Sequence, residues 1–345
     1  MLEVKKEGII LEKRELDFEK CGVLNPGIYQ EGDKVHVFYR AVTENNHSTL
    51  GYCILKGPLT VEVRFDQSIL APVFTYESHG VEDARIVKID DLYYLTYTAY
   101  DGINALGCLA TSENLIHFKH YGIIVPKISL DLFRHVLDFK PEMNEKYYRY
   151  NKEWKSTELV DSNFVWDKNV VFFPRRIQGK LCFLHRIKPE VQLVQIQELS
   201  DLTPEFWEDY LLHLEDHIVL SAKYKHEVSY IGGGCPPIET EHGWLVIYHS
   251  VYDTLEGYVY VACAALLELE NPQNELSRLP YPLIVPEEIW ERKGEVNNVC
   301  FPTGTAIFGD QLYIYYGAAD ERIACASMSF SGLVNTLNLL ITTPN

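Results

Sequence analysis

Two neighbouring carboxylates and an arginine are the residues of this chain most suited to chemistry. They stand in the segment Glu82-Asp83-Ala84-Arg85, directly before an alternating apolar strand. A carboxylate beside an arginine is often a structural ion pair, but such charge clusters also mark functional sites. Because this segment opens a repeated unit of the chain, a functional role is favoured.

The repeated unit is a turn followed by a strand, and it occurs five times. Aligned on the second turn residue, each copy has apolar residues two and four positions later and Tyr or His six positions later. The turn residues are Asp33, Asp91, Gly179, Gly243 and Asp310, and the sixth positions hold Tyr39, Tyr97, His185, His249 and Tyr316. Apolar spacing of two after such a turn predicts a hairpin strand with one buried face.

The spacing of the turns indicates the fold. Successive turns lie 58 to 88 residues apart, and repeats of roughly 40–50 residues or more built from short strands are typical of propeller blades. The longest interval holds an insertion at about 129–160, whose segment 130–137 is expected to be helical. We predict an all-β fold, a five-bladed β-propeller with a short helical insertion, as a single domain over residues 1–345. Two β-sandwiches would explain the alternation but not the regular spacing.

A propeller places the ends of its inner strands around a central channel. Polar residues at equivalent positions of the blades therefore converge on one site. The candidates on this basis are Asn25, Arg40, Asp83, Arg85, Lys168, Arg176, His185, Arg186, Tyr248, His249 and Asp320.

Composition narrows the class of partner. The formal net charge of −18 argues against a nucleic acid or an anionic membrane, since both require clustered Lys and Arg. No apolar run reaches 18 residues, and the first seven residues do not form a signal peptide. The eight cysteines are scattered without a C-x-x-C pair, which favours buried thiols over disulfides or metal ligands. We expect a cytoplasmic protein that binds no metal.

Longer motifs resemble glycoside hydrolase family 130, which comprises β-mannoside phosphorylases and a smaller set of β-mannosidases. The matching segments are 80–85, 167–174, 232–249, 298–304 and 315–320, and the resemblance runs from about residue 20 to 328. It implies a five-bladed propeller with the site in the central cavity, in agreement with the repeat. It also implies a carbohydrate as the small-molecule substrate.

The resemblance further implies a role for individual residues. Asp83 matches the single acid, which protonates the glycosidic oxygen. The implied substrate-binding residues around the mannosyl unit are Asn25, Arg40, Glu82, Arg85, Phe301 and Asp320. The groups around phosphate are Lys168, Tyr248 and His249. Inorganic phosphate is a co-substrate, and no other cofactor is expected.

Two reaction types fit these residues. An inverting phosphorylase needs one acid and no base, because phosphate is already a nucleophile, and we predict phosphorolysis of a β-linked mannoside to α-mannose 1-phosphate. An inverting β-mannosidase, acting for example on β-1,2-mannosides, needs a second carboxylate about 6.5–9.5 Å from the acid. Thr49 and Leu106 stand where many phosphorylases have arginine, so this alternative stays open, with Glu239 or Asp253 as its base. A non-catalytic carbohydrate-binding propeller is the third possibility.

Overall fold

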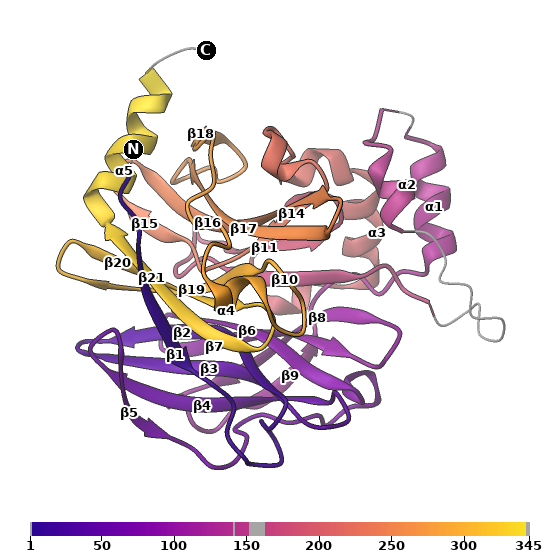
Figure 1. Ribbon diagram of the computed structural model, residues 1–345. Coiled ribbons are helices and arrows are strands. Elements are labelled where there is room, and N and C mark those ends of the chain that lie inside the picture. The colour runs from indigo at the N-terminus through magenta and orange to yellow at the C-terminus, as the bar shows by residue number, and fades with distance from the viewer. Residues whose placement is uncertain (1, 141, 152–162, 343–345) are drawn as a thin grey trace.

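The structure is a computed structural model that describes residues 2–140, 142–151 and 163–342 (Figure 1). Within these residues the strands group by antiparallel pairing into five units. The first is β2 (Gly22–Glu31), β3 (Lys34–Val42), β4 (Ser48–Lys56) and β5 (Thr60–Arg64). The second is β6 (Gly80–Ile89), β7 (Leu92–Tyr100), β8 (Ala105–Ser112) and β9 (Lys119–Ile123). The third is β10 (Asp167–Phe172), β11 (Leu181–Ile187), β12 (Val191–Ile196) and β13 (Ile218–Leu220).

The fourth unit is continuous in sequence, whereas the fifth combines strands from both ends of the chain. The fourth is β14 (Tyr230–Gly233), β15 (Ile238–Thr240), β16 (Gly243–Thr254), β17 (Gly257–Leu267) and β18 (Glu275–Arg278). The fifth is β19 (Cys300–Phe308), β20 (Gln311–Ala318), β21 (Arg322–Ser329) and β1 (Lys5–Leu11). Figure 1 shows indigo β1 beside yellow β21, so the first strand of the chain completes the last unit.

The hydrophobic core is divided among five clusters that each lie between two units. Consecutive units share four of them, represented by Phe38 with Val81, Val87 with Phe172, Phe173 with Trp244, and Ile247 with Ile314. The fifth cluster joins the last unit to the first, through residues such as Val35 and Tyr315. Apolar side chains on both faces of a sheet stabilise it when both faces are covered. Each unit is therefore packed on both sides.

Helices occupy connections between strands, except for the last one, which follows β21. They are α1 (Leu130–Asp138), α2 (Lys146–Tyr150), α3 (Pro204–Leu212), α4 (Ile289–Arg292) and α5 (Phe330–Thr342), with short 3₁₀ turns at Thr75–Glu77, Leu199–Asp201, Leu214–His217 and Lys225–Glu227. The side chain of Ser129 caps α1 by accepting a hydrogen bond from the backbone of Leu132. Phe133 and Leu137 then bury its apolar face. The predicted helix at 130–137 is confirmed, and residues 152–160 of the insertion lie outside the described residues.

Among the described residues, no helix is both long and apolar enough to span a membrane.

The five predicted turns fall in five different units, but the predicted register of the fourth is wrong. Leu245 and Ile247 were aligned with core residues that face the preceding unit, yet they face the following one. Trp244 and Tyr248 occupy the side toward the preceding unit instead. Successive side chains of a strand point to opposite faces, so an offset of one residue exchanges the two faces. Tyr248, not His249, is therefore the counterpart of Tyr39 in the first unit.

Four units place a buried glutamate against that tyrosine. The tyrosine hydroxyl donates to the carboxylate at 2.5–2.7 Å in the pairs Tyr39–Glu19, Tyr97–Glu77, Tyr248–Glu227 and Tyr316–Glu291. A basic side chain completes each group, namely Arg64, His120, Arg278 and Lys6 respectively. Buried carboxylates require such partners. In the third unit His185 occupies the equivalent place and bonds Asp167 at 2.7 Å.

The first strands of four units each contain a β-bulge at an equivalent position. The pairing register shifts between Leu24 and Gly27 in β2, Glu82 and Arg85 in β6, Lys168 and Val171 in β10, and Pro302 and Gly304 in β19. Asn25, Asp83 and Asn169 sit in these bulges with φ of 49°, 55° and 57°. A bulge redirects a side chain that regular pairing would place in the sheet faces. Here the redirected side chains are polar.

Candidate active site

The redirected side chains line a cavity of about 200 Å³ to which all five units contribute. Its lining residues are Asn25, Arg40, Asp83, Trp166, Lys168, Asn169, Arg186, Lys188, Tyr230, His249, Tyr260, Val299, Phe301 and Asp320. The structure thus brings together seven of the residues to which the sequence analysis assigned a role, from positions as distant as 25 and 320. They are Asn25, Arg40, Asp83, Lys168, His249, Phe301 and Asp320.

Asp83 is a buried carboxylate held by fixed donors. The side-chain amide of Asn25 donates to its Oδ1 at 2.7 Å, and Arg40 Nη1 lies 3.8 Å from the same oxygen. Burial by itself raises the pKa of Asp83, but the charges of Arg40, Lys168 and Arg85 outweigh that effect and the pKa lies below its ordinary value. With these groups as its neighbours, Asp83 is ionised at neutral pH.

Glu82 and Arg85 do not line the cavity themselves, but they hold Arg40 and Asp83, which do. Glu82 Oε1 forms an ion pair with Arg40 Nη2 at 2.8 Å and so fixes the guanidinium beside Asp83. Arg85 donates to the backbone carbonyl of Asp83 at 2.5 Å and to that of Gly234 at 3.1 Å. These bonds hold the strained backbone at Asp83 in the second unit against the fourth unit.

Positive charge gathers on the side of the cavity formed by the third unit. Lys168 and Arg186 are opposite each other in the β10–β11 pairing, and Lys188 follows β11. Burial is the largest cause that lowers the pKa of each of the three, and it brings the pKa of Lys188 to about 6. Lys168 and Arg186 carry the positive charge of this side at neutral pH, and Lys188, with its lowered pKa, takes up a proton more readily once an anion lies beside it, so this side of the cavity favours an anion.

His249 is neutral and orients the arginine. Its Nδ1 lies 3.1 Å from the carbonyl of Gly233, which can only accept, so Nδ1 carries the proton. Nε2 then presents a lone pair to Arg186 Nη1 at 3.5 Å. Burial first, and then Arg186, Arg85 and Lys188, lower the pKa of His249 well below its ordinary value.

Several lining atoms have no protein partner among the described residues. Asn25 Oδ1, Asn169 Oδ1 and Arg186 Nε are buried without a hydrogen bond. Buried polar atoms are nearly always satisfied in folded proteins, so atoms left open in a cavity indicate a polar ligand. Asp320 adds a carboxyl whose pKa is raised to about 6, by burial first and by Asp83, against the opposing charge of Arg40.

Two glycines make room for these side chains. A Cβ on Gly317 would lie 2.0 Å from Asn25 Oδ1, and a Cβ on Gly232 would lie 2.4 Å from the ring of His249. Any larger residue at either position would displace a residue of the cavity. Gly232 and Gly317 are thus explained by close approach to the site.

The sequence profile of family 130, described as beta-1,4-mannooligosaccharide phosphorylase, matches residues 13–339. The chain belongs to glycoside hydrolase family 130. The match covers all the lining residues of the cavity.

Characterised relatives in the family have similar length. The chain is 29% identical over 337 residues to a 1,2-beta-oligomannan phosphorylase of Thermoanaerobacter sp. (strain X514), covering 94% of this chain and 96% of the relative. It is 30% identical over 331 residues to a beta-1,2-mannobiose phosphorylase of the same strain, and this match covers 91% of this chain and 92% of the relative. The solved structure of a beta-1,2-mannobiose phosphorylase from Listeria innocua, in complex with beta-1,2-mannobiose, has the same fold. Its TM-score is 0.71 at 20% identity, with 98% of this chain and 100% of that chain covered.

Three predicted site residues of this family 130 chain lie away from the cavity. Tyr248 points into the core between the third and fourth units and donates to Glu227, because its strand face is the opposite of that of His249. Glu239 is half-exposed and paired with Arg175 at 2.8 Å. Asp253 is exposed near the end of β16 and accepts from Ser229 at 2.7 Å. The structure therefore places Tyr248 outside the cavity that holds Lys168 and His249, and neither Glu239 nor Asp253 lines that cavity beside Asp83.

The two positions that lack the family's common arginines are also outside the lining. Leu106 is buried in the core between the second and third units, and Thr49 lies in β4. Besides Arg40 of β3, the basic residues of this cavity come from β10, β11 and the segment after β11.

Sequence reasoning missed several residues of the site. Arg186 was a candidate without an assigned role, and Lys188 and Trp166 were not considered. The spacing of Arg186 and Lys188 could have predicted that Lys188 belongs to the site, because residues two apart on a strand point to the same face. Arg176, also a candidate, lies elsewhere and pairs with Glu198 at 3.1 Å.

Proposed function

We propose that the chain is an inverting phosphorylase that cleaves a β-linked mannoside with inorganic phosphate and releases α-mannose 1-phosphate. The observation that carries this proposal is the confinement of Lys168, Arg186 and Lys188 in the same cavity as the buried Asp83. A hydrolase has no need of an anion site facing its acid. The curated relatives named above are phosphorylases of β-mannosides, which supports the same reaction.

In this proposal the two sides of the cavity have separate tasks. Asn25, Arg40, Phe301 and Asp320 hold the mannosyl unit, and Lys168, Arg186 and Lys188 hold phosphate, with His249 orienting Arg186. A phosphate oxygen attacks the anomeric carbon as the bond to the leaving oxygen breaks, and the proton of Asp83 passes to that oxygen. Fixed cations position the phosphate and neutralise its charge, which an acidic protein would otherwise repel. No metal or organic cofactor takes part.

Phosphate binding also favours the protonated form of Asp83 in this scheme, with the proton taken up from solvent. Lys168 and Arg40 favour the ionised form of Asp83 while the cavity is empty. A bound phosphate anion offsets their field, so it raises the pKa of Asp83 toward the range in which a carboxyl acts as an acid. The anion thereby serves both as nucleophile and as the switch that protonates the acid.

We further propose that the five units are the blades of one closed β-propeller, with the cavity on its axis, in a single domain. Two features support this arrangement. Core clusters join every unit to the next and the last to the first, and β1 pairs with β21. An experimental structure with all five turns in successive blades around one axis is the expected result.

One incubation separates the two reaction types. Mannobiose isomers are given to the purified protein with and without phosphate, and the products are identified. The proposal expects α-mannose 1-phosphate and turnover that depends on phosphate. Free mannose released at the same rate without phosphate would establish the hydrolase instead, with Asp320 as the lining carboxylate available as base.

A further inference from the structure

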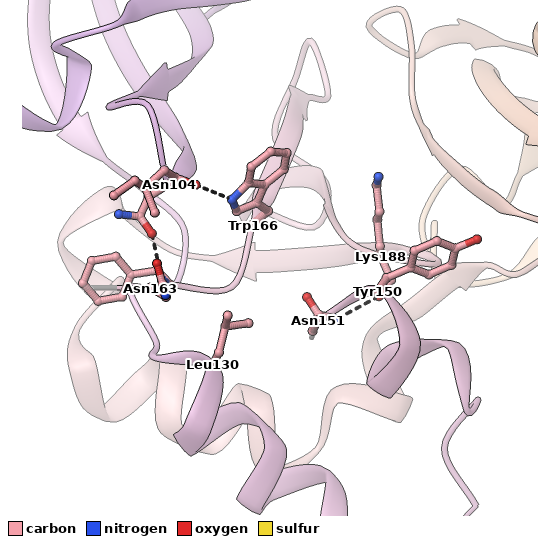
Figure 2. Close-up of a pocket in the computed structure, with 9 residues that line it drawn as sticks. Asn104, Leu130, Tyr150, Asn151, Asn163, Trp166 and Lys188 are labelled. Carbon is pink, nitrogen blue, oxygen red and sulfur yellow. Dashed lines mark hydrogen bonds between the residues drawn. The ribbon is translucent and has the colours of Figure 1, made fainter. Parts of the chain in front are cut away.

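A second hollow of about 210 Å³ adjoins the Asp83 cavity. Its lining residues are Ile103, Asn104, Leu130, Tyr150, Asn151, Asn163, Phe164, Trp166 and Lys188. Trp166 and Lys188 line both spaces, so the two meet at these side chains. Figure 2 shows Trp166 and Lys188 on one side of the hollow and Leu130 on the other.

The walls of this hollow suit a neutral sugar. Three asparagines and three aromatic rings line it, and Lys188 is the one charged lining residue among those described. Aromatic faces pack against the apolar faces of a sugar ring, and amide groups both donate to and accept from its hydroxyls. A hollow without carboxylates and with few charges neither repels nor competes with such hydroxyls.

The wall residues are held in place before any ligand arrives. The indole of Trp166 donates to the carbonyl of Ile103 at 2.8 Å while its ring stays partly exposed. Asn104 accepts from the backbone of Phe164 at 2.8 Å, and the hydroxyl of Tyr150 donates to the carbonyl of Ser229 at 2.9 Å. Fixed rings lose little conformational freedom on binding, so they favour affinity.

Another hollow also adjoins the Asp83 cavity, but its walls are charged and lack aromatic rings. It shares Arg40 and Asp320 with the cavity, and its other lining residues include Lys13, Glu44 and Glu295 but no aromatic ring. Charged, solvated walls of this kind offer a sugar ring no face to pack on. Of the two neighbouring spaces, the one beside Trp166 is the better match for a carbohydrate.

We propose that the hollow beside Trp166 binds the sugar on the leaving side of the cleaved bond, and so selects the acceptor in the reverse reaction. This inference rests on the proposed phosphorylase function. The helical insertion contributes Leu130, Tyr150 and Asn151 to the hollow. The insertion that interrupts the repeat thereby becomes the element that determines acceptor preference.

The test uses two variants confined to the hollow and one matched control. Phe164→Ala removes an aromatic wall, and Asn163→Trp fills the space; neither residue lines the Asp83 cavity. Tyr121→Ala removes a half-exposed aromatic ring on β9 as the control. Synthesis from α-mannose 1-phosphate and mannose or mannobiose is followed while each substrate is varied.

The two hollow variants are expected to raise KM for the acceptor about tenfold or more and to change KM for α-mannose 1-phosphate less than twofold. The control should change neither. Equal loss for both substrates, or an unchanged acceptor KM in both variants, would overturn the inference. Absence of any phosphate-dependent reaction in the unmodified protein would instead refute the proposed function.

A binding measurement keeps the test independent of turnover. Mannobiose is titrated calorimetrically into Asp83→Asn protein with and without Asn163→Trp, after circular dichroism confirms folding. Weaker binding by about tenfold in the double variant supports the assignment, and equal affinity contradicts it.

Discussion

Asp83 combines an uncommon backbone conformation with three neighbouring positive charges, and both follow from its place in a bulge. Asp83→Asn keeps the shape of the carboxyl but cannot release a proton. We expect mannoside binding within a fewfold of normal and turnover lower by about 10²–10⁴-fold, the usual contribution of general acid catalysis. Steady-state rates with mannobiose measure the loss. A nitrophenyl mannoside should suffer less, because its leaving group needs little protonation, and near-normal turnover of mannobiose would refute the assignment.

Loss of a basic residue of the third unit should weaken the binding of phosphate more than the binding of mannoside. Arg186→Met keeps much of the volume and removes the charge and its donors. The expected result is a KM for phosphate at least tenfold higher, since a charge-assisted hydrogen bond contributes about 1.5–3 kcal/mol. Glu239→Gln, which alters a half-exposed ion pair outside the cavity, serves as the control. A rise in the KM for mannoside alone would place phosphate elsewhere.

The raised pKa of Asp320 predicts that kcat/KM for mannoside depends on pH between 5 and 7. Its pKa of about 6, raised chiefly by burial and opposed by Arg40, means that it ionises as pH rises from 5 to 7. An ionised carboxylate accepts two sugar hydroxyls, so kcat/KM for mannoside should rise through about pH 6. Asp320→Asn should abolish that rise while lowering the plateau. A rise at pH 6 that persists in Asp320→Asn would assign it to another group.

At the scale of elements, the buried tyrosine–glutamate–base groups bind the strands of four units to the segments that precede them. Glu77 illustrates their strength: burial by itself raises its pKa, yet bonds from His120, Tyr97 and two backbone amides bring the pKa down to about 2. Because the folded pKa is below the unfolded value, the stabilisation is present above pH 4.5 and is lost as pH falls toward 2.

Tyr97→Phe removes one donor to Glu77 and leaves the ring in place. We expect the free energy of unfolding to fall by about 1–3 kcal/mol at pH 7, the cost of leaving a buried acceptor short of a partner. The difference from the unmodified protein should shrink as the pH falls below 4 and become smallest near pH 2, where Glu77 of the folded unmodified protein is also protonated. Chemical denaturation at the two pH values measures it. A difference that is independent of pH would show that the ring's packing, not the carboxylate, is responsible.

At the scale of the whole molecule, we expect the N-terminal strand β1 to contribute strongly to the stability of the fold. β1 pairs with β21, and Lys6 forms a buried ion pair with Glu291 of a distant segment. Removal of residues 1–11 would expose the edge of β21 and leave Glu291 without its cation. We expect a large fall in Tm or aggregation, measured by thermal unfolding and light scattering. Leu11→Ala should lower the stability by about 2–5 kcal/mol without loss of the fold. An unchanged Tm after truncation would contradict the closure of the last unit by β1.

The repeat was readable from the sequence because each unit meets the same physical demand. A strand with one face in a core needs apolar residues at every second position, and a tight turn needs Gly, Asp or Asn. These local rules correctly predicted the five turns, the helix at 130–137 and the all-β character. They failed in the fourth unit, where the flanking segment permits either register and packing against the neighbours decides.

The site was only partly determined by the sequence. Its motifs identified the family, and with it Asn25, Arg40, Asp83, Lys168, His249, Phe301 and Asp320 as residues of one region, and all seven line the cavity. The tertiary structure alone decided that Tyr248 faces the core, that Glu239 and Asp253 lie outside, and that Lys188 and Trp166 belong to the site. The reason is physical. Residue type is a local property, whereas a cavity is formed by side chains whose direction depends on bulges, register and the packing of five separate units.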